Sequence, residues 1–425
     1  MSKHHKLTLT AAIFTNINIM AGAGIFINTV LLTKLTGIIG SFAYLMIGLF
    51  MLPLITSIAY LVKQHPTGGF YAFAQPISPF LGFLSCWIYF FSKLASTSLV
   101  LYVSAVFLKQ LFPNGLSLIT TLPLSLCILT LFTYLNLFNI HIGSVIQKVF
   151  FSAKSIPVLF VISIGLMHCS TFSLSFNSIN FSSVSTTIPL VLYCLAGFEA
   201  ACAISRNIEN PQENAPKAIF YSFFILVAAY TIFQLFTSMM ILPNINHLDS
   251  YQDAFPYITQ FIPVPWLSEK ISSFLSLCIL TSTLGGAYGM LFSNQWNLYT
   301  LAEHNHTFAS RQITTLNNHE IPTLAVLIEA FVCGLYLLIT QGNQIPLQQT
   351  ASLGAAIAYT ISIIALLLQT SRLHKTPWLA LVTCSGFIVS CIISTLTHSI
   401  SSLTLFIIML TIGIVMFHLN KKQNP

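Results

Sequence analysis

Met20–Phe26 reads Met-Ala-Gly-Ala-Gly-Ile-Phe and lies in the middle of the first long apolar run, residues 9–32. Its two glycines, Gly22 and Gly24, stand where this run would lie deepest in a membrane. Each glycine costs a helix interior about 1 kcal/mol relative to alanine. Broken backbone at that depth is tolerated only where it is buried in protein or lines a cavity. The stretch therefore predicts either a close helix–helix contact or one wall of a binding site.

The composition indicates a membrane protein. The chain has 425 residues, of which 55% are hydrophobic and only 6% are charged, whereas soluble domains carry about 25% charged residues. Its net charge of +7 comes from basic residues at the ends of apolar runs, where they set topology, so we expect no nucleic-acid partner. The nine cysteines are scattered without regular spacing, which favours small core residues over disulfides or metal ligands.

Twelve apolar runs approach the length of about 20 residues that a membrane helix needs. Most basic residues fall on the side that both termini share, which predicts that both are cytoplasmic. We therefore expect an all-α, multi-pass protein of the plasma (inner) membrane with twelve transmembrane helices. The expected spans lie near residues 9–32, 38–62, 79–108, 117–136, 143–166, 186–206, 216–242, 271–302, 321–340, 348–370, 376–396 and 400–419.

The sixth run repeats the unusual feature of the first, because Gly197 and Glu199 lie near its centre. Five spans separate the two stretches, and an odd number reverses the direction of the chain in the membrane. Paired glycine-interrupted spans indicate a transporter built from inverted repeats, with a site near the midplane. We expect a 5+5 inverted repeat with discontinuous helices 1 and 6.

The same reasoning divides the chain into two parts. A ten-helix transport core would occupy residues 1–370, with one repeat at about 9–166 and the other at about 186–370. Residues 371–425 would form accessory helices 11 and 12 and a cytoplasmic tail.

Four motifs occur in this order along the chain: Gly22–Phe26, Gly68–Phe73 with Pro79–Phe83, Ala196–Glu199 with Asn210–Ile219, and Leu284–Gly286. They resemble those of the amino acid–polyamine–organocation (APC) superfamily of permeases, over about residues 8–340. Loop and helix 3 patterning is most similar to the arginine/agmatine exchanger branch. The resemblance implies a secondary active transporter that moves amino acids by alternating access, through proton coupling or exchange.

A zwitterionic amino acid offers a carboxylate and an ammonium to the two breaks. Free backbone N–H groups at the start of a half-helix suit a carboxylate, and free carbonyls suit an ammonium. The carboxylate would be bound by Ala21, Gly22, Ala23, Gly24 and Ile25, and the ammonium by carbonyls around Ala196, Gly197 and Phe198. Tyr193 stands where the exchanger branch has a tryptophan gate, so it is either a weaker cation–π partner or an ordinary packed aromatic.

Lys93 departs most from the exchanger pattern. It lies midway along the third span, with Tyr89 and Thr97 one turn to either side, on the face that the resemblance turns toward the substrate side chain. A lysine there would repel a guanidinium. It would suit an acidic side chain, or a neutral one if it is paired with Glu199 or Glu329; it could also be purely structural. Ala287, where the branch has a bulky aromatic, predicts a roomier or differently shaped pocket.

Glu199 and Lys154 are the candidate proton-coupling residues. An acid at a helix centre costs about 2.5–3.5 kcal/mol on insertion scales, so its default interpretation is functional, and the resemblance implies a proton-sensitive glutamate here. The resemblance also places Lys154 where sodium would sit between helices 1, 5 and 8 of sodium-dependent relatives. The alternatives are a structural acid for Glu199 and a lysine reaching the membrane surface for Lys154.

No catalytic triad, paired carboxylates or phosphate loop is present in the sequence, so we expect neither an enzyme nor an ATP-driven pump. No catalytic residue, cofactor or metal is predicted. The expected partners are a small amino acid and the lipid bilayer, and a homodimer is compatible with the sequence. Two alternatives remain open: a polyamine or arginine/agmatine-type antiporter, and a substrate-sensing transceptor that binds without transporting.

Overall fold

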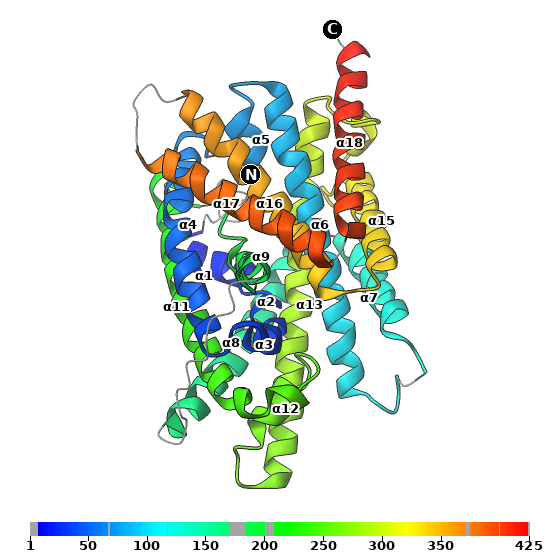
Figure 1. The fold of residues 1–425 in the computed structure, drawn as a ribbon. Coiled ribbons are helices and arrows are strands. Elements are labelled where there is room, and N and C mark those ends of the chain that lie inside the picture. Colours follow the sequence, from blue (N-terminus) through cyan, green and yellow to red (C-terminus); the bar gives the residue numbers. More distant parts are fainter. Residues whose placement is uncertain are drawn as a thin grey trace.

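The computed structural model describes residues 7–66, 69–116, 118–138, 140–169, 183–199, 202, 208–369, 375–398 and 400–423. These residues form an elongated bundle of helices (Figure 1), with two isolated β-bridges and no longer strand among them. The expectation of an all-α membrane protein is confirmed at this level.

Eight helices in the described part are long and apolar enough to cross a membrane, and three shorter helical segments are also apolar. The count of twelve crossings stays a prediction. The eight are α4 (Ile39–Gln64), α6 (Pro79–Leu111), α11 (Pro211–Ile241), α13 (Pro265–Glu303), α15 (Thr323–Thr340), α16 (Gln344–Gln369), α17 (Lys375–His398) and α18 (Ile400–Gln423). The shorter segments lie in α7 (Thr121–Asn136), α8 (Ile140–Met167) and α9 (Val184–Leu195).

The first apolar run is not one helix. Thr8 caps α1 (Leu9–Met20) by accepting a hydrogen bond from the Ala11 N–H at 3.3 Å. The helix ends at Ala21, whose ψ of 68° leaves the helical region. The chain resumes as α2 (Gly24–Ile27) and α3 (Thr29–Thr36). The break that the glycine pair predicts is therefore present.

The sixth run also stops being helical where its glycine lies. The helix α9 ends at Leu195, Ala196 is extended, and Gly197 has a φ of +104°. Side chains disfavour that backbone conformation, which explains the glycine. Residues 200, 201 and 203–207, which would continue this span, lie outside the described residues.

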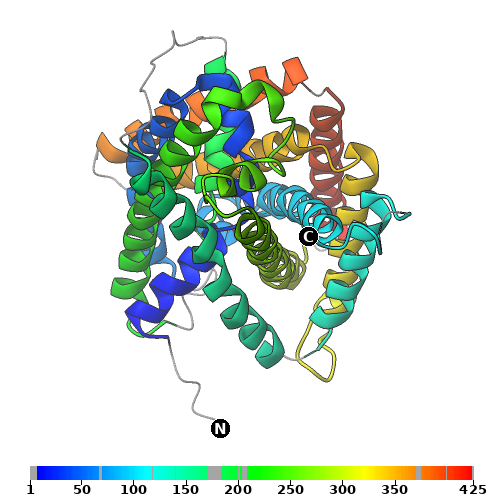
Figure 2. The same ribbon diagram turned by 90° about the horizontal axis from the view of Figure 1, so that it is seen from below.

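The helices α6 and α13 pack against each other in the interior, and Figure 2 shows α13 near the centre of the bundle with α6 beside it. The helix α16 packs on α6 and on α17, while α11 packs on α4 and α1. The helix α18 contacts α6 and α17. The short elements are α5 (Gly69–Ala74), η4 (Leu242–His247), α12 (Ala254–Thr259) and α14 (Ser310–Ile313).

A loop residue, His306, contacts the short helix α5. The His306 Nε2 atom lies 2.9 Å from the hydroxyl of Tyr71 on α5, and the His306 ring also packs against Phe417 of α18. Burial, together with the neighbouring His304, lowers the pKa of His306 to about 4. Burial raises the pKa of Tyr71 to about 12. Both groups are therefore uncharged at neutral pH.

Candidate functional site

The two breaks lie directly against each other. A Cβ at Gly24 would lie 2.8 Å from Sγ of Cys194 and 3.2 Å from the ring of Tyr193. A Cβ at Gly197 would lie 3.5 Å from Cα of Met20. Gly24 begins the helix α2, so the close approach of Cys194 and Tyr193, rather than an unusual backbone conformation, is what favours glycine here.

Two asparagines of the first run hold the breaks together. Asn16 on α1 donates a hydrogen bond to the carbonyl of Phe198 at 3.2 Å. Asn28, after the break, donates to the carbonyl of Leu190 on α9 at 2.9 Å. Both asparagines are fully buried. The Phe198 carbonyl belongs to the irregular backbone after α9, so Asn16 satisfies a group that lacks a helical partner, whereas Leu190 lies within α9.

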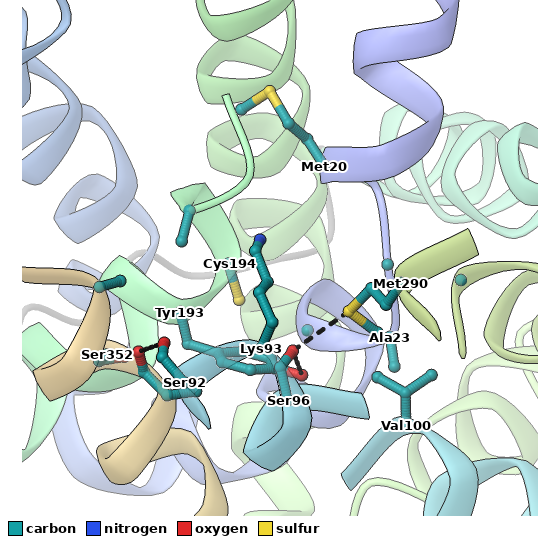
Figure 3. Close-up of a pocket in the computed structure, with 16 residues that line it drawn as sticks. Met20, Ala23, Ser92, Lys93, Ser96, Val100, Tyr193, Cys194, Met290 and Ser352 are labelled. Atoms are coloured by element: carbon teal, nitrogen blue, oxygen red, sulfur yellow. Dashed lines mark hydrogen bonds between the residues drawn. The ribbon is translucent and has the colours of Figure 1, made fainter. Parts of the chain in front are cut away.

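A cavity of about 50 Å³ lies where the breaks meet (Figure 3). Its walls come from the first break, α6, α9, α13 and α16. The lining residues are Met20, Gly22, Ala23, Gly24, Ser92, Lys93, Ser96, Val100, Tyr193, Cys194, Ala196, Gly286, Met290, Ala351, Ser352 and Ala355.

The first break offers backbone donors at this cavity. The Gly22 N–H bonds to the Met20 carbonyl at 2.7 Å, and the N–H groups of Phe26 and Ile27 bond to the Ala23 carbonyl. No described residue accepts a hydrogen bond from the N–H groups of Ala23, Gly24 or Ile25. Ala23 and Gly24 line the cavity. A carboxylate is the kind of ligand that such backbone donors suit.

Glu199, beside the second break, has donors on both carboxylate oxygens. The Tyr89 hydroxyl donates to Oε1 at 2.6 Å, and the Tyr359 hydroxyl donates to Oε2 at 2.8 Å. The Gly197 N–H donates to Oε2 at 2.8 Å, so the carboxylate caps the break from which it comes. The Glu199 side chain is 1% exposed. The carboxylate oxygens therefore accept hydrogen bonds from protein groups, and Glu199 is not among the residues that line the cavity.

Lys93 completes this network. Its Nζ lies 3.1 Å from Oε1 of Glu199 and 5.2 Å from the centroid of the Tyr89 ring. Figure 3 shows the Lys93 side chain extending from α6 with its amine directed away from Ser92 and Ser96. Of the two acids that the sequence offered as partners, the structure selects Glu199. Glu329 is 1% exposed, and its Oε1 has no hydrogen-bond partner among the described residues.

Lys154 contacts the broken end of α1. Its Nζ donates to the carbonyl of Asn18 at 2.8 Å, and the side chain is buried. Asn18 lies in the last turn of α1, where carbonyls lack helical partners. The ammonium of Lys154 on α8 therefore binds the end of the half-helix that precedes the cavity. Among the described residues, no cluster of His, Cys, Asp or Glu could hold a metal ion.

The predicted binding residues divide into those that line the cavity and those that lie behind it. Gly22, Ala23, Gly24, Lys93, Tyr193 and Ala196 line it. Tyr89, Gly197 and Phe198 lie in the supporting network. Thr97 donates to the carbonyl of Lys93 within α6, and its neighbour Ser96 lines the cavity instead. Gly286 likewise lines the cavity in place of Ala287, and neither Ala21 nor Ile25 is among the lining residues.

Sequence reasoning missed the contribution of α16. Ala351, Ser352 and Ala355 line the cavity, and Tyr359 bonds Glu199. Small residues and a tyrosine recur here at spacings of three and four, which places them on one face of a helix. That pattern could have drawn attention to α16, but it is also common in ordinary helix packing within membranes.

A bundle of apolar helices with a cavity between two broken segments defines a class of membrane carrier proteins. Residues 7–417 match the amino acid permease family, so the chain belongs to that family.

Curated relatives are distant. An uncharacterized transporter of Legionella pneumophila is 22% identical over 57% of this chain and 56% of its own length. An aromatic amino acid permease of Lactococcus lactis is 24% identical over 48% and 45%. The chain thus spans about half the length of these two relatives. A gamma-aminobutyric acid permease of Bacillus subtilis is 22% identical over 84% and 77%.

Proposed function

We propose that the chain is a secondary active transporter that carries amino acids across the membrane by alternating access. The observation that carries the proposal is the cavity between the two breaks, which Ala23 and Gly24 line. Among the described residues, none accepts a hydrogen bond from the N–H groups of Ala23, Gly24 and the adjacent Ile25. These donors would bind the substrate carboxylate. The Ala196 carbonyl, on the opposite wall, would accept from the substrate ammonium. Family membership and the amino acid permeases among the relatives support the same class of substrate.

Packing supports a division into two moving groups. The helix α11 contacts α1, α4 and α9, and α6, α7, α13 and α15 form a second set of contacts. The first group would rock against the second around the cavity, as in other transporters built around a fixed midplane site.

In this proposal the chain keeps the finer architecture expected from the sequence. Twelve crossings would form a 5+5 inverted repeat, with a core at 1–370 and accessory helices at 371–425. Both termini would lie in the cytoplasm, at the inner membrane. Glu199 and Lys154 would couple transport to protons, since each is a buried ionisable group bonded to the end of a broken helix. Transport assays would distinguish this coupling from exchange and from arginine/agmatine-type or polyamine antiport. A homodimer is a separate question, tested by measuring the oligomeric state.

The test is counterflow in proteoliposomes. Vesicles loaded with a mixture of the twenty unlabelled amino acids should accumulate labelled amino acids through the wild-type protein. Gly24→Trp should abolish accumulation by filling the cavity, whereas Gly334→Ala, where a Cβ would meet nothing within 4 Å, should retain it. Equal flux through wild type and Gly24→Trp would overturn the proposal. Ligand binding without any counterflow would identify a transceptor instead.

A further inference from the structure

We propose that the site accepts small α-amino acids with uncharged side chains, and that the Lys93–Glu199 pair imposes the choice of charge. This inference rests on the proposed transport function and assigns its substrate class.

The two side chains of the Lys93–Glu199 pair differ in their exposure to the cavity. The Lys93 side chain is 17% exposed and lines the cavity, whereas the Glu199 side chain is 1% exposed behind it. A basic substrate side chain would meet the ammonium of Lys93 and find no free carboxylate. An acidic side chain would have to draw Lys93 away from Glu199. That would leave a buried carboxylate without its counter-charge, which is strongly unfavourable. A neutral side chain leaves the pair intact.

The chemistry of the walls also favours a neutral substrate. The Ser92 hydroxyl donates to the Ala351 carbonyl at 2.6 Å, and the Ser352 hydroxyl donates to the Pro189 carbonyl at 2.8 Å. Their protons are therefore already used within the protein. The Ser96 hydroxyl lies 3.2 Å from that of Tyr193, to which it donates. What remains on these walls is a mainly small, apolar surface with two hydroxyl groups close together.

The cavity volume of about 50 Å³ limits the size of the substrate. One water molecule needs about 10–15 Å³ of such space, so the cavity accommodates a few waters or one small solute. Two side chains narrow the cavity. Tyr193 accepts a hydrogen bond from the Ser96 hydroxyl, and the sulfur of Met290 lies 3.5 Å from the same hydroxyl. Methyl and hydroxymethyl side chains fit this space better than branched or aromatic ones. The expected substrates are therefore glycine, alanine and serine.

The first experiment measures competition in wild-type proteoliposomes with labelled alanine. Unlabelled alanine, glycine and serine should each inhibit uptake at least about tenfold more strongly than phenylalanine, aspartate or lysine, a difference of about 1.4 kcal/mol. Preferred inhibition by a charged or aromatic amino acid would overturn the inference while leaving amino acid transport intact. Absence of counterflow for all twenty amino acids would instead overturn the proposed function.

The second experiment separates the two charges. Glu199→Gln keeps a hydrogen-bonding group of similar shape but leaves the Lys93 cation facing the cavity. Competition by aspartate relative to asparagine, which is nearly isosteric, should rise at least about tenfold, since an opposite charge is now available to the substrate. The double variant Lys93→Met/Glu199→Gln should restore the wild-type ratio.

A surface ion pair provides the matched control. Glu213 and Lys217 on α11 lie 3.8 Å apart with side chains 72% and 52% exposed, so Glu213→Gln should leave the aspartate/asparagine ratio unchanged. The ratio is measured on one preparation and does not depend on the amount of folded protein. An unchanged ratio in Glu199→Gln would overturn the role of the pair. If that variant does not fold, the wild-type asparagine-against-aspartate comparison decides, and equal inhibition by the two overturns the charge selection.

Discussion

The two helix breaks meet at one cavity but are satisfied in different ways. At the first, the N–H groups of Ala23, Gly24 and Ile25 have no acceptor among the described residues. At the second, the carboxylate of Glu199 folds back onto the Gly197 N–H and also binds Lys93. The second break therefore contains its own anion, whereas the described residues supply none to the first.

Under the proposed function, this difference would give the two breaks separate tasks. The carboxylate is common to all amino acids, so the donors of the first break would capture substrate without choosing among side chains. The Lys93–Glu199 pair beside the second break would cancel most of the charge that a substrate side chain meets. Capture and selection would then be divided between segments about 175 residues apart in sequence, and single substitutions can test them separately.

The largest effect is expected from a methyl group at the first break. Gly24→Ala places a Cβ 2.8 Å from Sγ of Cys194 and 3.2 Å from the Tyr193 ring, so these side chains on the cavity wall must shift. Gly22→Ala meets only the Met20 carbonyl oxygen at 4.0 Å. Alanine counterflow should therefore fall by more than about tenfold in Gly24→Ala and by much less in Gly22→Ala. Equal loss in both would show that backbone flexibility, rather than the contact with α9, is what Gly24 provides.

The next largest effect concerns the pair at the second break. Lys93→Met leaves a buried carboxylate without its cation, which typically costs about 3–5 kcal/mol. The double variant with Glu199→Gln should be considerably more stable than Lys93→Met alone, because no uncompensated charge remains. Thermal unfolding in detergent measures both. If the double variant is no more stable than Lys93→Met, the interaction between the two charges is not what stabilises this break.

The sequence alone located both breaks but did not determine which side chains meet there. The glycine pair located the first break, and Gly197 with Glu199 located the second, because glycine and a buried acid are both costly in a membrane helix. The sequence left two partners open for Lys93, since it does not fix how a helix is rotated. The helix α6 is buried on almost every side, so its apolar pattern cannot show that Ser96 rather than Thr97 faces the cavity.

A smaller effect is expected from the buried hydrogen bonds of Asn28. Asn28 donates to the Leu190 carbonyl and accepts a hydrogen bond from Gln348 at 3.0 Å. Asn28→Ala leaves both groups buried without this partner and should destabilise the fold by about 1–3 kcal/mol. Thr231→Val is the control, because the Thr231 hydroxyl donates to the Val227 carbonyl of its own helix; it should change stability by less than about 0.5 kcal/mol. A similar loss in both variants would contradict a specific role for Asn28.

The smallest effect lies far from both breaks, at His306. Its folded pKa of about 4 is below the ordinary value of about 6.5, so between these values the unfolded chain binds a proton that the folded one does not. Stability should therefore be complete above pH 6.5 and decline as the pH falls toward 4. His306→Phe should flatten this part of the unfolding profile, whereas replacing the exposed His247 by Gln should not. An unchanged slope in His306→Phe would show that other groups cause the decline.

The most direct test of the division between the breaks is an experimental structure with alanine bound in the cavity. The account predicts that the alanine carboxylate lies within hydrogen-bond distance of the N–H groups of Ala23, Gly24 and Ile25, with its methyl group toward Ala351 and Ala355. The Lys93–Glu199 contact should remain intact. A carboxylate bound to Lys93, with Glu199 released from it, would contradict the account.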